Sequence, residues 1–115
     1  MAKGKNTLVD FELESGETVK MTLAFYLLLG LKQHRKDVYD RYNRIQVKGP
    51  TEEMDVVTVL YAAYLCAYIQ KNGTADGAMS EQDFLIGCGS DRKAVMDAYK
   101  SLTNPKAQAA FANRS

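Results

Sequence analysis

The feature that most constrains this chain is an apolar stretch near its middle, residues 50–71. Pro50 and the acidic residues after it are typical of a helix start, because proline fits the first turn and carboxylates favour the positive end of the helix dipole. The residues that follow are almost free of charge on every side of the predicted helix, and such a helix is buried or forms a subunit interface. Tyrosines and polar flanks disfavour a membrane span. We therefore predict a central apolar helix over about residues 52–71.

Length and charge limit the class of protein. A chain of 115 residues is long enough for one modest core. Fifteen basic residues against fourteen acidic ones leave a formal net charge of +1, whereas nucleic-acid-binding domains usually carry a clear basic excess. No basic-then-apolar signal segment opens the chain. The sequence therefore predicts a cytosolic globular protein for which neither a membrane nor nucleic acid is the expected partner.

Residue types that carry catalysis are few. Cys66 lies within the apolar stretch and is expected to be a reduced core thiol, since two cysteines are too few for a disulfide scaffold. His34, the only histidine, lies among lysines and arginines at an expected helix end. Two cysteines and one histidine cannot complete a zinc site, and no phosphate-binding loop or nucleophile motif is found in the sequence. We predict a protein that is not an enzyme and needs no cofactor.

A β-hairpin is expected at the N-terminal end, over about residues 7–22. Residues 7–13 alternate in polarity, a Glu-Ser-Gly-Glu turn signal follows, and residues 18–22 are again β-prone. Two strands alone are marginally stable in water, so the hairpin must pack on helices or pair with another copy.

Helical periodicity follows the hairpin. Thr22 can cap a helix that runs to about residue 36, and Asp37 can cap a second helix. Whether residues 23–47 form one bent helix or two is left open. The expected buried stripe of the first helix is Leu23, Tyr26, Leu27 and Leu31.

The C-terminal third carries two shorter helices. Residues 71–79 form a loop with two glycines, after which Ser80 starts a helix and Asp83, three residues later, completes a pattern like a capping box. Ser90 is expected to cap a further helix, which an Asn-Pro pair ends. Residues 105–115 form a tail that is helical or frayed.

These elements predict a mainly α fold. The N-terminal hairpin packs on a bundle of about four to five helices arranged around the central apolar helix. Residues 1–104 form a single domain, because no linker, internal repeat or low-complexity segment divides them.

The loop after the central helix has the spacing of an EF-hand calcium site over residues 72–83. Its candidate oxygen ligands are Asn72, Thr74, Asp76 and Asp83, and Gly77 falls where such a loop needs a sharp turn. Two carboxylates give few ligand charges and therefore weak binding. The alternative is a glycine-rich connector that ends in a helix cap, and a calcium-responsive interaction module is kept as a hypothesis.

Two surfaces are candidates for partner binding. Residues 32–48 have a basic excess that includes Arg41 and Arg44, so they can contact phosphates or an acidic partner, or form a solvated helix face. Tyr61, Tyr64 and Tyr68 share one side of the central helix and can stack on bases. A core or subunit interface suits this tyrosine row better, since tyrosine favours sites with one apolar side and one wet end. Weak nucleic-acid binding is therefore kept as a second alternative.

The order of features is similar to that of a known family. The motifs that carry the resemblance span about residues 8–102 and are ESGETVKMTL, FYLLLGLK, VYDRYNRIQVKGP, EEMDVVTVLYAAYLCAYI, MSEQDFLI and SDRKAV. Together they resemble the small tail assembly chaperones of long-tailed, siphovirus-type bacteriophages and of prophages of Gram-positive bacteria.

The resemblance implies a non-enzymatic chaperone that acts in the cytoplasm of the bacterial host and is absent from the mature virion. Its implied partners are the tape-measure protein, which it coats, and the tail-tube protein, which it recruits. We also predict self-association through the central helix or through the helix over residues 23–31. The residues proposed to contact a partner are Val57, Tyr61, Tyr64, Tyr68, Arg41 and Arg44.

Overall fold

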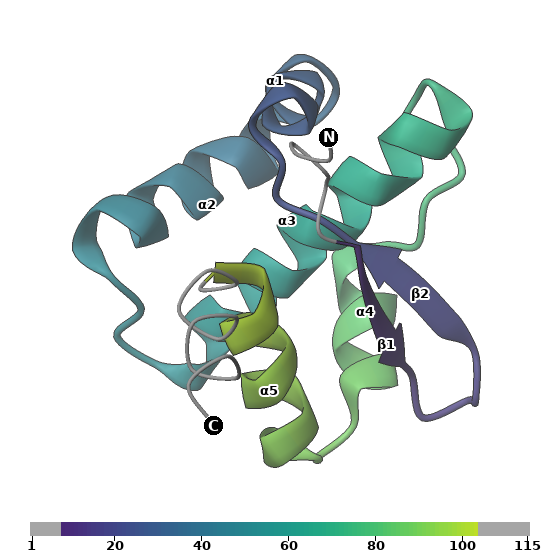
Figure 1. Ribbon diagram of the computed structural model, residues 1–115, viewed down its shortest axis with the longest axis vertical. Coiled ribbons are helices and arrows are strands. Elements are labelled where there is room, and N and C mark those ends of the chain that lie inside the picture. Colours follow the sequence, from purple (N-terminus) through teal and green to yellow (C-terminus); the bar gives the residue numbers. More distant parts are fainter. Residues whose placement is uncertain (1–7, 104–115) are drawn as a thin grey trace, which may run out of the picture.

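The structure is a computed structural model that describes residues 8–103, and it is mainly helical (Figure 1). The elements, in chain order, are β1 (Val9–Glu12), β2 (Thr18–Met21), α1 (Phe25–His34), α2 (Lys36–Lys48), α3 (Glu53–Asn72), α4 (Glu81–Cys88) and α5 (Arg92–Thr103). The predicted fold class, a hairpin packed on helices around a central apolar helix, is confirmed. The tail predicted at 105–115 lies outside the described residues.

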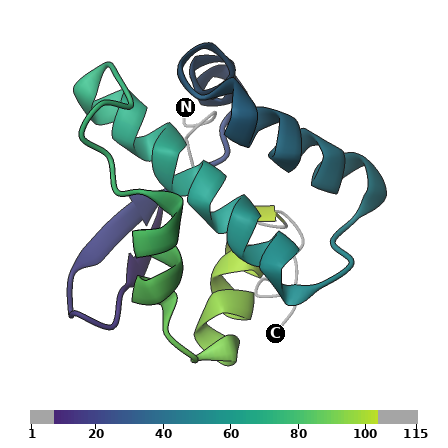
Figure 2. The ribbon, with the colours of Figure 1, turned by 180° about the vertical axis from the view of Figure 1, so that it is seen from behind.

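The central helix is α3, and the other elements are arranged around it. It runs diagonally through the molecule, with α1 and α2 on one side and α4, α5 and the hairpin on the other (Figures 1 and 2). Every residue from Val56 to Ala67 is buried. Gly73 ends the helix in the left-handed conformation, at φ 78°, where its N–H donates to Ile69 O. The apolar side chains on all sides of this part of α3 are therefore covered by other elements of the same chain.

The hairpin is held against the helices by its backbone as well as by its side chains. β1 and β2 pair antiparallel, with Val9 opposite Met21. Phe11, Val19 and Met21 on the inward face are buried, and Val9 is half-buried. The Thr22 N–H donates to Ala63 O of α3 at 3.1 Å. This contact corrects the sequence prediction for Thr22, which does not cap a helix. It is buried where the hairpin meets α3, and α1 begins three residues later at Phe25.

Residues 23–47 contain two helices, so the question that the sequence left open is answered. α1 and α2 meet at Arg35, whose φ of −142° interrupts the helical backbone. The prediction that Asp37 caps α2 is wrong. The Asp37 carboxylate instead accepts two hydrogen bonds from the Arg35 guanidinium, at 3.0 and 3.1 Å.

The buried stripe of α1 also differs from the predicted one. Leu27, Leu28 and Leu31 are buried, whereas Tyr26 is 61% exposed and hydrogen-bonds to Gln70. Because α1 lies against both α2 and α3, the buried side includes Leu28, and Tyr26 is turned toward the edge.

Side-chain caps define the two C-terminal helices. Ser80 Oγ accepts a hydrogen bond from the Asp83 N–H at 3.1 Å, so the predicted cap of α4 is confirmed. The predicted cap of α5 is wrong by one residue. Asp91, not Ser90, accepts the bond from the Ala94 N–H, at 3.0 Å.

Candidate functional site

The tyrosine row of α3 fastens the loop that follows the helix. Tyr61 OH donates to Met79 O at 2.8 Å, and the Met79 N–H donates to Tyr64 OH at 2.8 Å. Tyr68 OH donates to Asp76 O at 2.9 Å. The hydroxyl ends that suggested a wet interface are therefore bonded to the backbone of residues 76–79 within the same chain.

The rings of this row pack on Phe84 of α4. The Tyr61 and Tyr64 ring centroids each lie 5.6 Å from that of Phe84, and the Phe11 centroid, from β1, lies 6.4 Å from it. Tyr61 is fully buried and Tyr64 is 8% exposed, and desolvation raises the pKa of Tyr64. These two predicted contact residues thus form an aromatic core cluster in the folded chain, while Tyr68 is half-buried.

The two predicted arginines occupy different environments. Arg41 donates to both carboxylate oxygens of Glu81, at 3.0 and 2.7 Å, which ties α2 to α4. This hydrogen bonding raises the pKa of Arg41. Arg44 is exposed and, with Lys48, lines an open cavity of about 440 Å³ between α2 and the start of α3. Of the predicted pair, Arg44 is the cation that an acidic partner can reach more easily.

Two of the four calcium-loop candidates, Asn72 and Thr74, make side-chain hydrogen bonds to the backbone nearby. The Asn72 side-chain amide donates to Tyr68 O, and the Thr74 hydroxyl accepts from the Asp76 N–H. Gly77 has the positive φ, 88°, that a sharp turn needs. Within residues 8–103, no group of three or more His, Cys, Asp or Glu side chains is placed to hold a metal ion. The geometry is that of a connector that ends in the Ser80 cap.

Neither cysteine is poised as a nucleophile. Both thiols are free and buried, and burial raises the pKa of Cys66 to about 12 and that of Cys88 to about 11. A thiol reacts as its thiolate, so at neutral pH both side chains behave as small apolar groups.

The surface that stands out for binding lies on α1. Phe25 is 91% exposed and Leu29 is 58% exposed, one helical turn apart. They border an open groove of about 330 Å³ between α1 and α2, which Leu28 and Tyr39 also line. We call Phe25, Leu29 and this groove the α1 patch. Two large apolar side chains at such exposure beside a groove make this surface a candidate for partner binding.

A sequence signal for the α1 patch exists in the composition of its helix. The stretch FYLLLGL is apolar at nearly every position, whereas a helix against two neighbours buries only a stripe. The remaining apolar side chains of this helix must be exposed, but the sequence does not show which residues they are.

A smaller apolar groove of about 200 Å³ lies between α3, α4 and α5. Val57, which had been predicted to contact a partner, is 9% exposed and lines it together with Leu85. Met54 and Met96, which also line it, are 48% and 37% exposed. Flexible methionines suit a surface that adapts to apolar segments.

Across the part of the chain that the structure describes, no helix has the length and hydrophobicity needed to cross a lipid bilayer. Comparison of the chain with family models, curated proteins and solved structures finds no match.

Proposed function

We propose that this protein is a non-enzymatic tail assembly chaperone that binds an apolar helical segment of a tape-measure protein through the α1 patch. The observation that carries the proposal is the exposure of Phe25 and Leu29 on a folded chain in which Tyr61 and Tyr64 are buried in the core. The sequence resemblance supplies the class of client. The work proposed for the protein is to keep that client soluble in the host cytoplasm until tail-tube subunits assemble around it, without entering the mature virion.

The chemistry of the α1 patch suits such a client. Covering a fully exposed phenylalanine or leucine contributes about 1.5–3 kcal/mol. Phe25 is close to that limit and Leu29, which is 58% exposed, contributes less, so together they supply part of a reversible affinity. A groove between two helices accepts the apolar side of an amphipathic helix, whose anchors recur every three or four residues. Lys32 at the groove, 5.7 Å from the Tyr39 ring centroid, offers a cation to acidic residues of the client.

Self-association is proposed through the same patch when no client is present. Two copies that cover each other's Phe25 and Leu29 would protect the apolar surface until the client displaces one of them. Light scattering over a wide concentration range tests this, because the apparent mass of the wild type should rise with concentration and that of a Phe25→Ser/Leu29→Ser variant should not.

The test of the function is co-expression with the tape-measure protein of the same phage or prophage. The chain should co-purify with it and raise its soluble fraction, and Phe25→Ser/Leu29→Ser should abolish both effects. A matched control is Ile86→Ser, which removes an apolar side chain that is 66% exposed on α4, on the other side of α3. Equal capture by the wild type and the double variant would reject the α1 patch, and no capture by any of them would reject the function.

The two alternative functions have less support from the contacts. Calcium binding would compete with the bond that the Thr74 hydroxyl accepts from the Asp76 N–H. Nucleic-acid binding would rely on Arg44 and Lys48, whose cavity also contains the Asp55 carboxylate. Neither alternative uses the exposed side chains of α1.

A further inference from the structure

β1 leaves one edge of the hairpin without a strand partner among residues 8–103. The sheet has only the order β1–β2, and the bond from the Leu13 N–H to Glu17 O fixes which opposed pairs are hydrogen-bonded. Because such pairs alternate along an antiparallel ladder, the backbone N–H and C=O groups of Asp10 and Glu12 point away from β2. The edge formed by these groups is a template for another strand.

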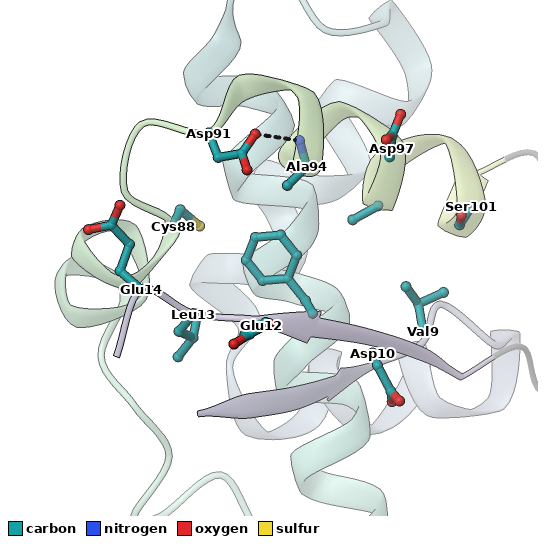
Figure 3. A pocket seen from close by; sticks show the side chains of 12 residues that line it. Val9, Asp10, Glu12, Leu13, Glu14, Cys88, Asp91, Ala94, Asp97 and Ser101 are labelled. Carbon is teal, nitrogen blue, oxygen red and sulfur yellow. Dashed lines mark hydrogen bonds between the residues drawn. The ribbon is translucent and has the colours of Figure 1, made fainter. Parts of the chain in front are cut away.

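A groove lies along this edge, between β1 and α5. Its volume is about 520 Å³, and Phe11, Ala94 and Ala98 are among the side chains that line it. α5 runs beside β1 (Figures 1 and 3), but its own backbone groups are bonded within the helix. Alanines on the facing side of α5 leave space that larger residues would fill. The groove is therefore large enough for a few residues of extended chain, and β1 supplies backbone groups to pair with them.

Among residues 8–103, the charged side chains that line the groove are all acidic. Five carboxylates are in this part of the lining: Asp97 lies on α5, Asp91 caps the start of α5, and the others lie on or just after β1 (Figure 3). Asp10 pairs with Lys20 at 2.6 Å and Asp97 with Lys93 at 2.8 Å, but both pairs are well exposed and weaken the local field only in part. A positively charged segment is favoured here. A second β1 strand is disfavoured, because it would bring like carboxylates opposite one another.

We propose that this groove binds an extended, lysine- or arginine-bearing segment of a partner protein, which adds a strand to the free edge of β1. Alternate residues of that segment point to opposite faces. Those on the inner face pack as small apolar side chains against Phe11 and Ala98. Those on the outer face place their cations beside Asp10 and Glu12. This site shares no residue with the α1 patch, and the proposal does not rest on the proposed function.

Amide hydrogen exchange, measured by NMR on the full chain, tests the strand addition directly. The probes are two short synthetic peptides, one of alternating lysine and valine and one with glutamate in place of lysine. In the free protein the Asp10 and Glu12 amides should exchange rapidly, whereas the Phe11 amide should be protected by β2. The lysine peptide should protect both outward amides, the glutamate peptide should not, and added salt should weaken binding.

Two variants at one position separate backbone pairing from charge. Glu12→Gln removes one carboxylate and should weaken binding about two- to fivefold, the range of a cross-strand charge pair. Glu12→Pro also removes the outward N–H while leaving the pairs with β2 intact, so binding should fall about tenfold or more. Asp40→Gln on α2, outside the groove, is the control and should bind like the wild type.

Several results would overturn the proposal. They are equal binding of both peptides, binding without protection of Asp10 and Glu12, and protection of these amides in the free protein. The last result would mean that the chain itself or a second copy already covers the edge. Because the exchange measurement uses the wild type, the proposal stays testable even if Glu12→Pro does not fold.

Discussion

The aromatic core cluster and the α1 patch are built from similar residues but have opposite environments. Tyr61, Tyr64 and Phe84 are enclosed by α3, α4 and the hairpin, and the two hydroxyls are bonded to Met79. Phe25 and Leu29 lie on α1, at the periphery, where α2 and α3 cover only one side of the helix. Aromatic content alone therefore does not identify a binding surface. The two regions differ in how many helices and strands pack around each of them.

The largest expected effect lies in the cluster. Phe84→Ala should lower the free energy of unfolding by about 3–5 kcal/mol, because it leaves a cavity between Phe11, Tyr61 and Tyr64. Urea denaturation followed by circular dichroism measures it. The matched change on the surface, Phe25→Ala, should have almost no effect. Similar losses from both variants would break the comparison, since they would mean that Phe25 is covered in the free protein.

Alkaline pH should act on the buried region and spare the patch. The pKa of Cys66 is raised to about 12 from its usual value near 9, so between these pH values the unfolded chain loses a proton that the folded chain keeps. The contribution of this thiol to the free energy of unfolding is thus fully present below about pH 9. Above that pH the contribution falls by roughly 1.4 kcal/mol per pH unit. Urea midpoints measured from pH 8 to pH 11 should fall less steeply for Cys66→Ala than for the wild type. Parallel curves would contradict burial of the thiol.

Removal of one hydroxyl tests the polar side of the cluster. Tyr64→Phe should cost about 1–3 kcal/mol, because the Met79 N–H loses its acceptor in a partly buried position. Tyr68→Phe should cost less, since water can replace its more exposed bond to Asp76 O. Chemical denaturation of the two variants gives the comparison. A larger loss for Tyr68→Phe would show that the end of the loop, and not Met79, is the part that the tyrosine row holds.

The smallest effect on stability is expected in the patch, where the effect on binding is largest. Phe25→Ser and Leu29→Ser should each change the free energy of unfolding by no more than about 0.5 kcal/mol, as is usual for exposed positions. Thermal denaturation of the same preparations used for client capture measures it. Variants that bind normally but unfold early would assign Phe25 and Leu29 to stability instead of recognition.

Local signals and overall pattern predicted much of the fold. The uncharged sequence after Pro50 predicted a central helix, and every residue from Val56 to Ala67 is buried. The turn signal before Thr18 predicted the hairpin, and Ser80 with Asp83 predicted the start of α4, because each depends on bonds between residues close in the chain.

The misplaced features depend on contacts between distant residues. Thr22 resembles a helix cap, but its N–H is taken by Ala63 of α3. Arg41 resembles a free surface cation, but it pairs with Glu81, forty residues away in the sequence. A helix that is apolar on every side has no periodicity that separates core tyrosines from interface tyrosines. The sequence therefore places the α3 tyrosines on one side of the helix, but it does not show whether that side faces the core or a partner. The groove beside β1 depends on where α5 packs, which no local pattern encodes.

The burial of α3 on all sides also affects how this chain can vary. A helix with a solvent face accepts substitutions there, so a complete mutational scan of α5 should alternate between tolerant and intolerant positions with the helical period. From Val56 to Ala67 no such face exists, and the scan should show an almost unbroken block of intolerance. Sequence change that preserves the fold is therefore expected to accumulate on the outer helices, which also carry the surfaces proposed here to bind partners.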